Sequence, residues 1–240
     1  VRGKSSATKY LHDVLASRDY DVYAKVTGNK PKSYRNGEAT PIQRDGRVTL
    51  YENERELRTH GAEDVAIFEN QGISDYTTRV VNQQFAHPDV VLLTNVRQDH
   101  RDTLGRTRAH IARSLAWSIP AETKVVIGEQ DEALRSFLLK ELRADGTAAS
   151  LVEVPEAHET VPGAEVIYGV DTVLEAMGLE PMDPRTRETL LDEMRVEWTS
   201  VPEGHVFNAA SVNDVESTEA IRRSLTDGYF DVVQPLVYLR

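Results

Sequence analysis

The stretch VRGKSSATKYL, residues 1–11, carries the strongest signal for the fold. Gly3-Lys4-Ser5 followed by a helix-forming run is how a phosphate-binding loop of the form G-x-x-x-x-G-K-[ST] ends. In such a loop the backbone N–H groups hold phosphates, the lysine neutralises their charge and the hydroxyl binds Mg²⁺. The triplet alone is weak, because a helix capped by Ser5 or Ser6 would have the same sequence. A nucleotide site therefore requires support from the segments that follow.

The segments that follow alternate between strand-like and helical patterns. A short strand is expected within 19–26, a further one at 123–128, and the apolar, β-branched runs at 64–70 and 88–96 are typical of strands buried on both faces. Helices are expected at 6–17 and in the segments between the strands, at 74–86, 106–118 and 131–144, the last of which has apolar residues at helical spacing. This repeated pattern predicts an α/β fold, a P-loop-type parallel sheet with helices on both faces.

We place a domain boundary after residue 203. The pattern is irregular over 155–203, where several prolines and two short helices are expected, and it restarts at 204 as strand, turn and helix, with another strand at 235–240. Residues 1–203 are thus expected to form one domain and 204–240 to begin a second. On this interpretation the chain starts inside the phosphate loop and stops inside the second domain. The Gly-, Pro- and Lys-rich segment 27–46 is predicted to be a long substrate or lid loop.

Composition limits the classes of partner. The 240 residues carry a net charge of 28 − 39 = −11, which argues against a nucleic-acid partner, because binding to phosphate backbones depends on a surface rich in Lys and Arg. Residues 1–36 nevertheless hold eight basic and three acidic residues, a local charge of 8 − 3 = +5. There are no cysteines and no apolar run that approaches the length of a membrane span, so we expect a cytoplasmic location.

Polar side chains follow two of the predicted strands. Glu69 lies at the end of the strand 64–70. Four further polar residues lie at the end of the strand 88–96 or just after it: Asn95, Asp99, His100 and Asp102. Ligands of open parallel sheets bind at the carboxyl ends of the strands, where a carboxylate can reach Mg²⁺ held by a phosphate loop. The plainer alternatives are a loop carboxylate and a set of helix caps. Their position after a Gly-Lys-Ser loop favours the nucleotide site.

Several motifs in the same order resemble one family. GKSS, ENQ, TNVRQDHRD and LGRTRAHIA are similar to the Mur-type ATP-dependent amide ligases, and most of all to the ATP-binding subunits of poly-γ-glutamate synthases, the CapB-like branch. That branch carries Arg-Gly-Lys-Ser-Ser, a Lys-x-Thr-Gly-x-x-Pro stretch like residues 25–31, and an Asn-Asp-x-x-Ser-Thr stretch like residues 213–218. The resemblance covers residues 1 to about 120 and 205–240.

The resemblance implies a central ATPase domain followed by a Rossmann-like C-terminal domain, with ATP and Mg²⁺ bound between them. The catalytic residues it implies are Lys4, Glu69 and His100. Ser5 and Glu69 would bind one Mg²⁺ and His100 a second. The residues it places at the nucleotide are Val1, Arg2, Gly3, Lys4, Ser5, Ser6, Asn95 and Asn213. Those it places near the acyl substrate are Thr27, Asn29 and Lys30.

The sequence departs from the family at one catalytic position. Muramyl ligases and folylpolyglutamate synthase have a carbamylated lysine after the Asp-His segment, where this chain has Ser114-Leu115-Ala116 and no lysine before Lys124. Either the second metal ion is held differently or there is only one.

The function implied is a ligase that forms γ-glutamyl amide bonds through an acyl phosphate, in the synthesis of poly-γ-glutamate. Its substrate would be glutamate or poly-γ-glutamate, attracted by the basic residues Lys30 and Lys32, and its partners would be small membrane subunits of the synthase, with a homo-oligomer also compatible. Three alternatives stay open: a Mur-type ligase for another carboxylate, a P-loop ATPase that regulates or assembles without ligating, and an inert domain that binds a membrane partner.

Three other residues are expected to be structural. His12 is expected on the surface of the first helix, and Trp117 and Trp198 are expected to pack among apolar neighbours.

Overall fold

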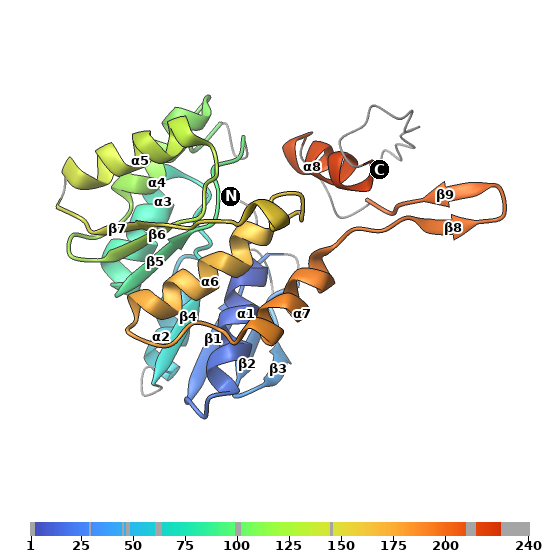
Figure 1. Cartoon of the computed structure of the whole chain (residues 1–240). Helices are drawn as coiled ribbons and strands as arrows, with labels where there is room; N and C mark the ends of the chain where they lie inside the picture. The colour runs from blue at the N-terminus through green and yellow to red at the C-terminus, as the bar shows by residue number, and fades with distance from the viewer. Residues whose placement is uncertain are drawn as a thin grey trace.

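The computed structural model describes residues 3–28, 30–44, 46, 49–60, 64–98, 102–144, 146–209 and 215–226. Its helices are α1 (Lys4–Ala16), α2 (Tyr51–His60), α3 (Asp75–Val80) continued by the π-helix η1 (Val81–Ala86), α4 (Arg108–Trp117), α5 (Glu132–Ala144), the short 3₁₀-helix η2 (Glu156–His158), α6 (Ala164–Ala176), α7 (Pro184–Met194) and α8 (Val215–Leu225). Figure 1 shows their arrangement around the strands. Within these residues no helix combines the length and the apolar character needed to cross a membrane.

The strands form two main sheets. In the first, β1 (Val22–Val26) pairs in parallel with β4 (Val65–Phe68), and the order is β3-β2-β1-β4. In the second, β5 (Val90–Leu93), β6 (Lys124–Ile127) and β7 (Ala149–Leu151) are all parallel. A separate hairpin joins β8 (Thr199–Val201) to β9 (Gly204–Val206) and extends away from the other elements (Figure 1). The predicted α/β class with parallel strands is confirmed, although the strands lie in two sheets and the first also contains antiparallel pairs.

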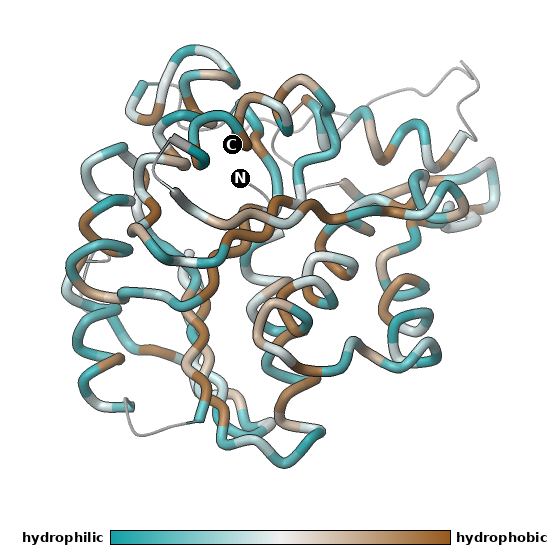
Figure 2. The backbone as a smooth tube through the Cα atoms, turned by 60° about the vertical axis from the view of Figure 1, so that its left-hand side comes forward, coloured by the Kyte–Doolittle hydropathy of each residue, from teal (hydrophilic) through white to brown (hydrophobic). Residues whose placement is uncertain are grey.

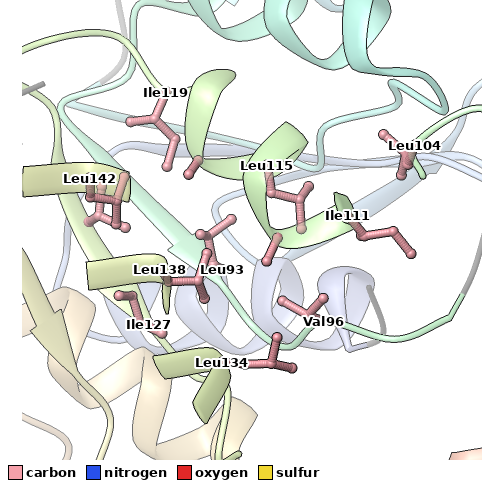
Figure 3. Packing of buried hydrophobic residues seen from close by; sticks show 13 residues of the cluster. Leu93, Val96, Leu104, Ile111, Leu115, Ile119, Ile127, Leu134, Leu138 and Leu142 are labelled. Carbon is pink, nitrogen blue, oxygen red and sulfur yellow. The ribbon is translucent and has the colours of Figure 1, made fainter. Parts of the chain in front are cut away.

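Helices cover both faces of the second sheet because its side chains alternate in direction. Val125 and Ile127 face a cluster formed with α4 and α5, whereas Val126, between them, packs with Val173 of α6. Figure 3 shows the first cluster, in which Ile111 and Leu115 of α4 meet residues of α5 and β5. In Figure 2 the hydrophobic residues run along the central strands, and the outer helices are largely hydrophilic.

The first sheet is covered by α1 and α6 on one face. Leu15 of α1 and Val22 of β1 belong to one buried cluster with Ile167 and Leu174 of α6. On the other face α2 contacts β1, since Tyr23 stacks on His60 with ring centroids 4.0 Å apart. The start of β1 is therefore packed from both sides of the first sheet.

The prediction of a long loop over 27–46 was wrong for its central part. Residues 32–41 form an antiparallel hairpin, β2 (Lys32–Arg35) and β3 (Glu38–Pro41), which extends the first sheet beyond β1. The reason is the turn Asn36-Gly37, where both residues have positive φ (47° and 91°), as a tight hairpin turn requires. The Asn36 side chain also accepts from the Val22 backbone N–H at 2.8 Å, which locks the turn to β1.

The hairpin also corrects the prediction for His12. This side chain is fully buried, because Tyr34 of β2 packs on it and the backbone N–H of Gly37 points at its Nε2 from 3.4 Å. Trp117 is 51% exposed, so the prediction that it packs among apolar side chains was also wrong; Arg113 lies over its ring.

The proposed boundary after residue 203 falls inside the turn between β8 and β9, which are hydrogen-bonded to each other. Two contacts link α8 to earlier residues: Arg97 pairs with Glu216 at 3.0 Å, and Trp198 donates from its ring N–H to the carbonyl of Leu225 at 2.9 Å. The strand expected at 235–240 lies outside the described residues.

Candidate functional site

The N-terminus of α1 follows a left-handed glycine and has no side-chain cap among the described residues, as at the end of a phosphate-binding loop. The helix begins at Lys4, and the residue before it, Gly3, is left-handed with φ 76°. Ser5 and Ser6 lie inside the first turn, and no side-chain cap bond is made at this end among the described residues. Helix N-termini of this kind are where phosphates bind in known sites, because the helix dipole and the N–H groups of the first turn favour an anion there.

Gly3 is required by its surroundings as well as by its backbone. A Cβ atom here would lie 2.5 Å from Cγ2 of Val166 in α6, closer than any normal contact. The phosphate-loop end of α1 is therefore packed directly against the start of α6.

Glu69 gathers three predicted residues around one carboxylate. Ser5 Oγ donates to Glu69 Oε2 at 2.8 Å, and the backbone N–H of Thr27 donates to the same oxygen at 3.0 Å. Lys4 Nζ lies 3.9 Å from the other oxygen, Oε1. Glu69 is only 8% exposed. The convergence follows from the parallel pairing of β1 and β4, whose carboxyl ends both lead to the start of α1.

The hydroxyl and the carboxylate fit a magnesium ion. Mg²⁺ prefers octahedral oxygen ligands at about 2.0–2.1 Å, so two adjacent ligands are about 2.9 Å apart. Ser5 Oγ and Glu69 Oε2 lie 2.8 Å apart in a hydrogen bond, so both oxygens are close enough to become ligands of one ion. No group of three or more His, Asp or Glu side chains suited to a metal occurs in the described residues. Two protein ligands are what Mg²⁺ uses when phosphates and water complete its shell.

Asn95 lies at the end of β5 and contacts a residue that the sequence did not indicate. Its side-chain N–H donates to Glu165 Oε1 at 3.2 Å, from the first turn of α6. Burial raises the pKa of Glu165, and the Asn95 hydrogen bond and the nearby Arg97 charge oppose that rise only in part. Since Val166 packs on Gly3, Asn95 and Glu165 belong to the same end of the fold as the phosphate loop.

A buried ionic network lies beside Thr27. Lys25 is fully buried, and its Nζ contacts Glu52 Oε1 at 2.7 Å and Asn53 Oδ1 at 2.6 Å. Arg44 makes a two-pronged pair with Glu52, at 2.7 and 2.6 Å, and also donates to the carbonyl of Gly28 at 2.9 Å and to Thr27 Oγ1 at 3.2 Å. Glu52 and Arg44 were missed because nothing in the sequence links them to residues 25–28.

The pKa values of Lys25 and Glu52 in this network are both lowered, for different reasons. Burial lowers the pKa of Lys25, although Glu52 opposes the shift. Burial acts to raise the pKa of Glu52, but the hydrogen bonds from Arg44 and Lys25 outweigh it and lower that pKa. Glu52 therefore stays ionised as the common partner of two cations.

The remaining predicted residues differ in what the structure says of them. Ser6 is half-buried in the first turn of α1, and Lys30 is exposed after β1. The residues that lie outside the described part are Val1, Arg2, Asn29, His100 and Asn213.

The departure from the family at the carbamylated lysine is consistent with the structure. Ser114 donates to the carbonyl of Leu104, and Lys124 begins β6 and donates to the carbonyl of Ala176 at the far end of α6. Lys124 thus lies where the parallel strands of the second sheet begin, whereas the candidate site lies where strands end.

The chain is similar to known proteins in sequence and in fold. No family model matches the chain. Among curated proteins it is similar to the PGA synthase CapB of Bacillus subtilis (strain 168), with 21% identity over 262 residues. That alignment covers 100% of this chain and 65% of CapB, so the chain spans less than two thirds of its relative.

Solved structures with the same fold include folylpolyglutamate synthases. E. coli FolC in complex with DHPP and ADP has a TM-score of 0.57 and 19% identity, over 80% of this chain and 55% of FolC. The apo form of L. casei FPGS has a TM-score of 0.62 and 17% identity, over 98% and 71%. The bifunctional folylpolyglutamate synthase/dihydrofolate synthase from Yersinia pestis, complexed with AMPPNP and Mn, has a TM-score of 0.53 and 17% identity, over 80% and 55%. The chain therefore has the fold of the folylpolyglutamate synthases, and the resemblance to Mur-type amide ligases that its sequence indicated is confirmed.

Proposed function

We propose that this protein is an ATP- and Mg²⁺-dependent carboxylate–amine ligase that forms γ-glutamyl amide bonds, with glutamate or poly-γ-glutamate as its substrate. The observation that carries the proposal is the meeting of Lys4, Ser5 and Glu69 at the N-terminus of α1. Similarity to proteins named PGA synthase and folylpolyglutamate synthase supports a glutamate-type substrate.

The electrostatics of the site suit a reaction between two anions. A substrate carboxylate is repelled by a triphosphate, so the site must neutralise charge and align the groups. The Lys4 ammonium and the N–H groups of the first turn of α1 supply positive charge where the phosphates would lie. Ser5 and Glu69 would hold Mg²⁺, which supplies further neutralisation when it is bound.

The proposed reaction has two bond exchanges. A carboxylate oxygen of the substrate bonds to the γ-phosphorus as the bond to the leaving ADP oxygen breaks, which gives an acyl phosphate. The amine nitrogen then bonds to the acyl carbon, loses a proton, and the carbon–oxygen bond to phosphate breaks. The released phosphate consequently carries one oxygen from the substrate carboxylate.

The other residues are assigned by resemblance together with position. Thr27 and Lys30 lie on the segment after β1 that would face the acyl substrate, along with Asn29. Asn95 would lie at the nucleotide, as would Asn213 from the second domain, and His100 would hold a second metal ion if one binds. We also propose that the division at residue 203 separates an ATP-binding domain from the start of a Rossmann-like one, and that small membrane subunits are partners.

The test is an isotope-transfer experiment with the full-length protein. Mg-ATP and glutamate labelled with ¹⁸O in its carboxylates are supplied, and the released phosphate is analysed by mass spectrometry. Label in the phosphate is expected, because a carboxylate oxygen must leave with it. Unlabelled phosphate, released at a rate that does not respond to glutamate or polyglutamate, would contradict the proposed ligase function and indicate a P-loop ATPase.

A further inference from the structure

The residues Lys25, Glu52 and Arg44, which we call the buried clamp, have no direct part in the reaction proposed above. A fully buried lysine is rare unless it is paired, and Lys25 meets this condition through Glu52. Glu52 is 6% exposed and comes from the first turn of α2, whereas Arg44 comes from the segment between β3 and α2. The clamp thus joins three separate parts of the chain by charge.

Arg44 uses its remaining N–H groups on the segment after β1. One nitrogen donates to the carbonyl of Gly28, and another donates to Thr27 Oγ1. A planar guanidinium held on one side by a two-pronged carboxylate pair has little freedom to turn. The position of residues 27 and 28 is therefore determined by Glu52 through Arg44.

Thr27 passes this constraint to the candidate metal ligand. Its backbone N–H donates to Glu69 Oε2, the same oxygen that receives the Ser5 hydroxyl. The Glu69 carboxylate is thus oriented by a donor whose own side chain is held by Arg44.

We propose that Arg44 is a positioning residue for the divalent-metal ligand Glu69, with Glu52 and the buried Lys25 as its anchor. The inference rests on the proposed function for its account of why the metal matters, but its test does not depend on ligation. Groups that hydrogen-bond to metal ligands commonly change metal affinity or activity by about 10- to 100-fold when they are removed. If the clamp served only the fold, substituting Arg44 would lower stability and leave the metal affinity unchanged.

The test measures Mn²⁺ affinity by electron paramagnetic resonance in the full-length protein with AMPPNP. Arg44→Ala is expected to weaken Mn²⁺ binding by about 10- to 100-fold, with the affinity for metal-free AMPPNP changed less than about twofold. Arg44→Lys should recover only part of the loss, since an ammonium cannot reproduce the two-pronged contact with Glu52 and still reach Thr27 and Gly28. In the metal-free protein, amide hydrogen exchange of the segment around Thr27 should become faster in Arg44→Ala.

The matched control is Arg187→Ala. Arg187 is another partly buried arginine in an ion pair, 2.8 Å from Asp171 on α6, and it belongs to none of the site contacts. It should lower stability while leaving Mn²⁺ affinity within about twofold of the parent. If Arg44→Ala behaves like Arg187→Ala, the positioning role is wrong. If Arg44→Ala does not fold, Glu52→Gln and Arg44→Lys give the same comparison.

The two proposals fail in different ways. A parent protein that binds Mn²⁺ with AMPPNP but transfers no ¹⁸O would contradict the ligase function, and the effect of Arg44 on metal affinity would still stand. A parent protein that transfers ¹⁸O, with metal affinity indifferent to Arg44, would support the ligase and overturn the positioning role.

Discussion

Substitutions in the buried clamp should affect stability unequally. Glu52 has two cationic partners, so Lys25→Met leaves it paired with Arg44. Lys25 has its hydrogen-bonded carboxylate in Glu52, and its other hydrogen bonds go to the amide oxygens of Asn53 and Gln71. Glu52→Gln therefore leaves a buried ammonium with no carboxylate in contact and only the weaker charge interaction with Glu56. Removing one partner of a buried pair is costly because the other charge stays in a medium of low polarity.

The expected magnitudes follow from what each change leaves unpaired. Lys25→Met removes the hydrogen-bond donor to the buried side-chain oxygen of Asn53, and an unsatisfied buried acceptor lowers the unfolding free energy by about 1–3 kcal/mol. Glu52→Gln isolates the Lys25 charge and should cost about 3–5 kcal/mol at neutral pH. The double variant should be less destabilised than Glu52→Gln alone, because it no longer contains the isolated charge. Urea unfolding of the four proteins measures these differences.

The pH dependence gives this reasoning a second check. Burial already lowers the pKa of Lys25, and loss of Glu52 should lower it further. A lysine with a lowered folded pKa destabilises the fold while it is protonated, and that penalty falls as pH rises toward its ordinary value of 10.5. The Glu52→Gln deficit should therefore shrink between pH 7 and pH 9.5. A deficit that is constant with pH, or smaller than that of Lys25→Met, would refute the account of the clamp.

Three further outcomes are expected. Glu69→Gln should raise the Mg²⁺ concentration needed for ATP consumption by about 10-fold or more, because a neutral amide binds the ion weakly. The thermal unfolding temperature of this variant should change little. Ser5→Ala should also raise the Mg²⁺ concentration that is needed. Reversing the exposed charges in Lys30→Glu/Lys32→Glu should weaken polyglutamate binding at low salt, and the difference should disappear at about 1 M salt, as titration calorimetry can show. In acid, the lowered pKa of Glu52 contributes stability that is fully present above its ordinary value of 4.5 and is lost as pH falls through the lowered value. The unfolding free energy of Glu52→Gln, measured by urea unfolding at a series of acidic pH values, should therefore depend less on pH than that of the parent.

The sequence was sufficient for features that depend on local order. The βα alternation predicted the strands at 22–26, 65–68, 90–93 and 124–127, because apolar, β-branched runs between helical segments have few other structures. The convergence of Ser5 and Glu69 was also predictable, since ligands and phosphate loops both lie at the carboxyl ends of parallel strands.

The features that the sequence did not reveal depend on pairing across the chain. The Asn36-Gly37 turn was a readable hairpin signal, but the many Gly, Pro and Lys residues around it suggested a loop. Once the hairpin was missed, His12 was placed on the surface, because the burial of a helix face depends on what packs against it. Arg44 and Glu165 carry no pattern of their own: Glu165 meets Asn95 from a distant part of the chain, and Arg44 meets Glu52 and residues 27 and 28 only once the hairpin and α2 are in place.

The clamp joins the segment proposed to meet the acyl substrate to the carboxylate proposed to hold the metal. Thr27 belongs to the first and hydrogen-bonds to the second, so the two cannot move independently while that N–H is bound to Glu69. If the metal fixes Glu69, it also fixes residues 27 and 28, and a substrate that orders those residues must favour the metal-ready position of Glu69. Linkage requires the two effects to be equal in free energy. A ligase gains from such coupling, because it favours the assembly of metal, nucleotide and carboxylate in one complex before phosphate is transferred.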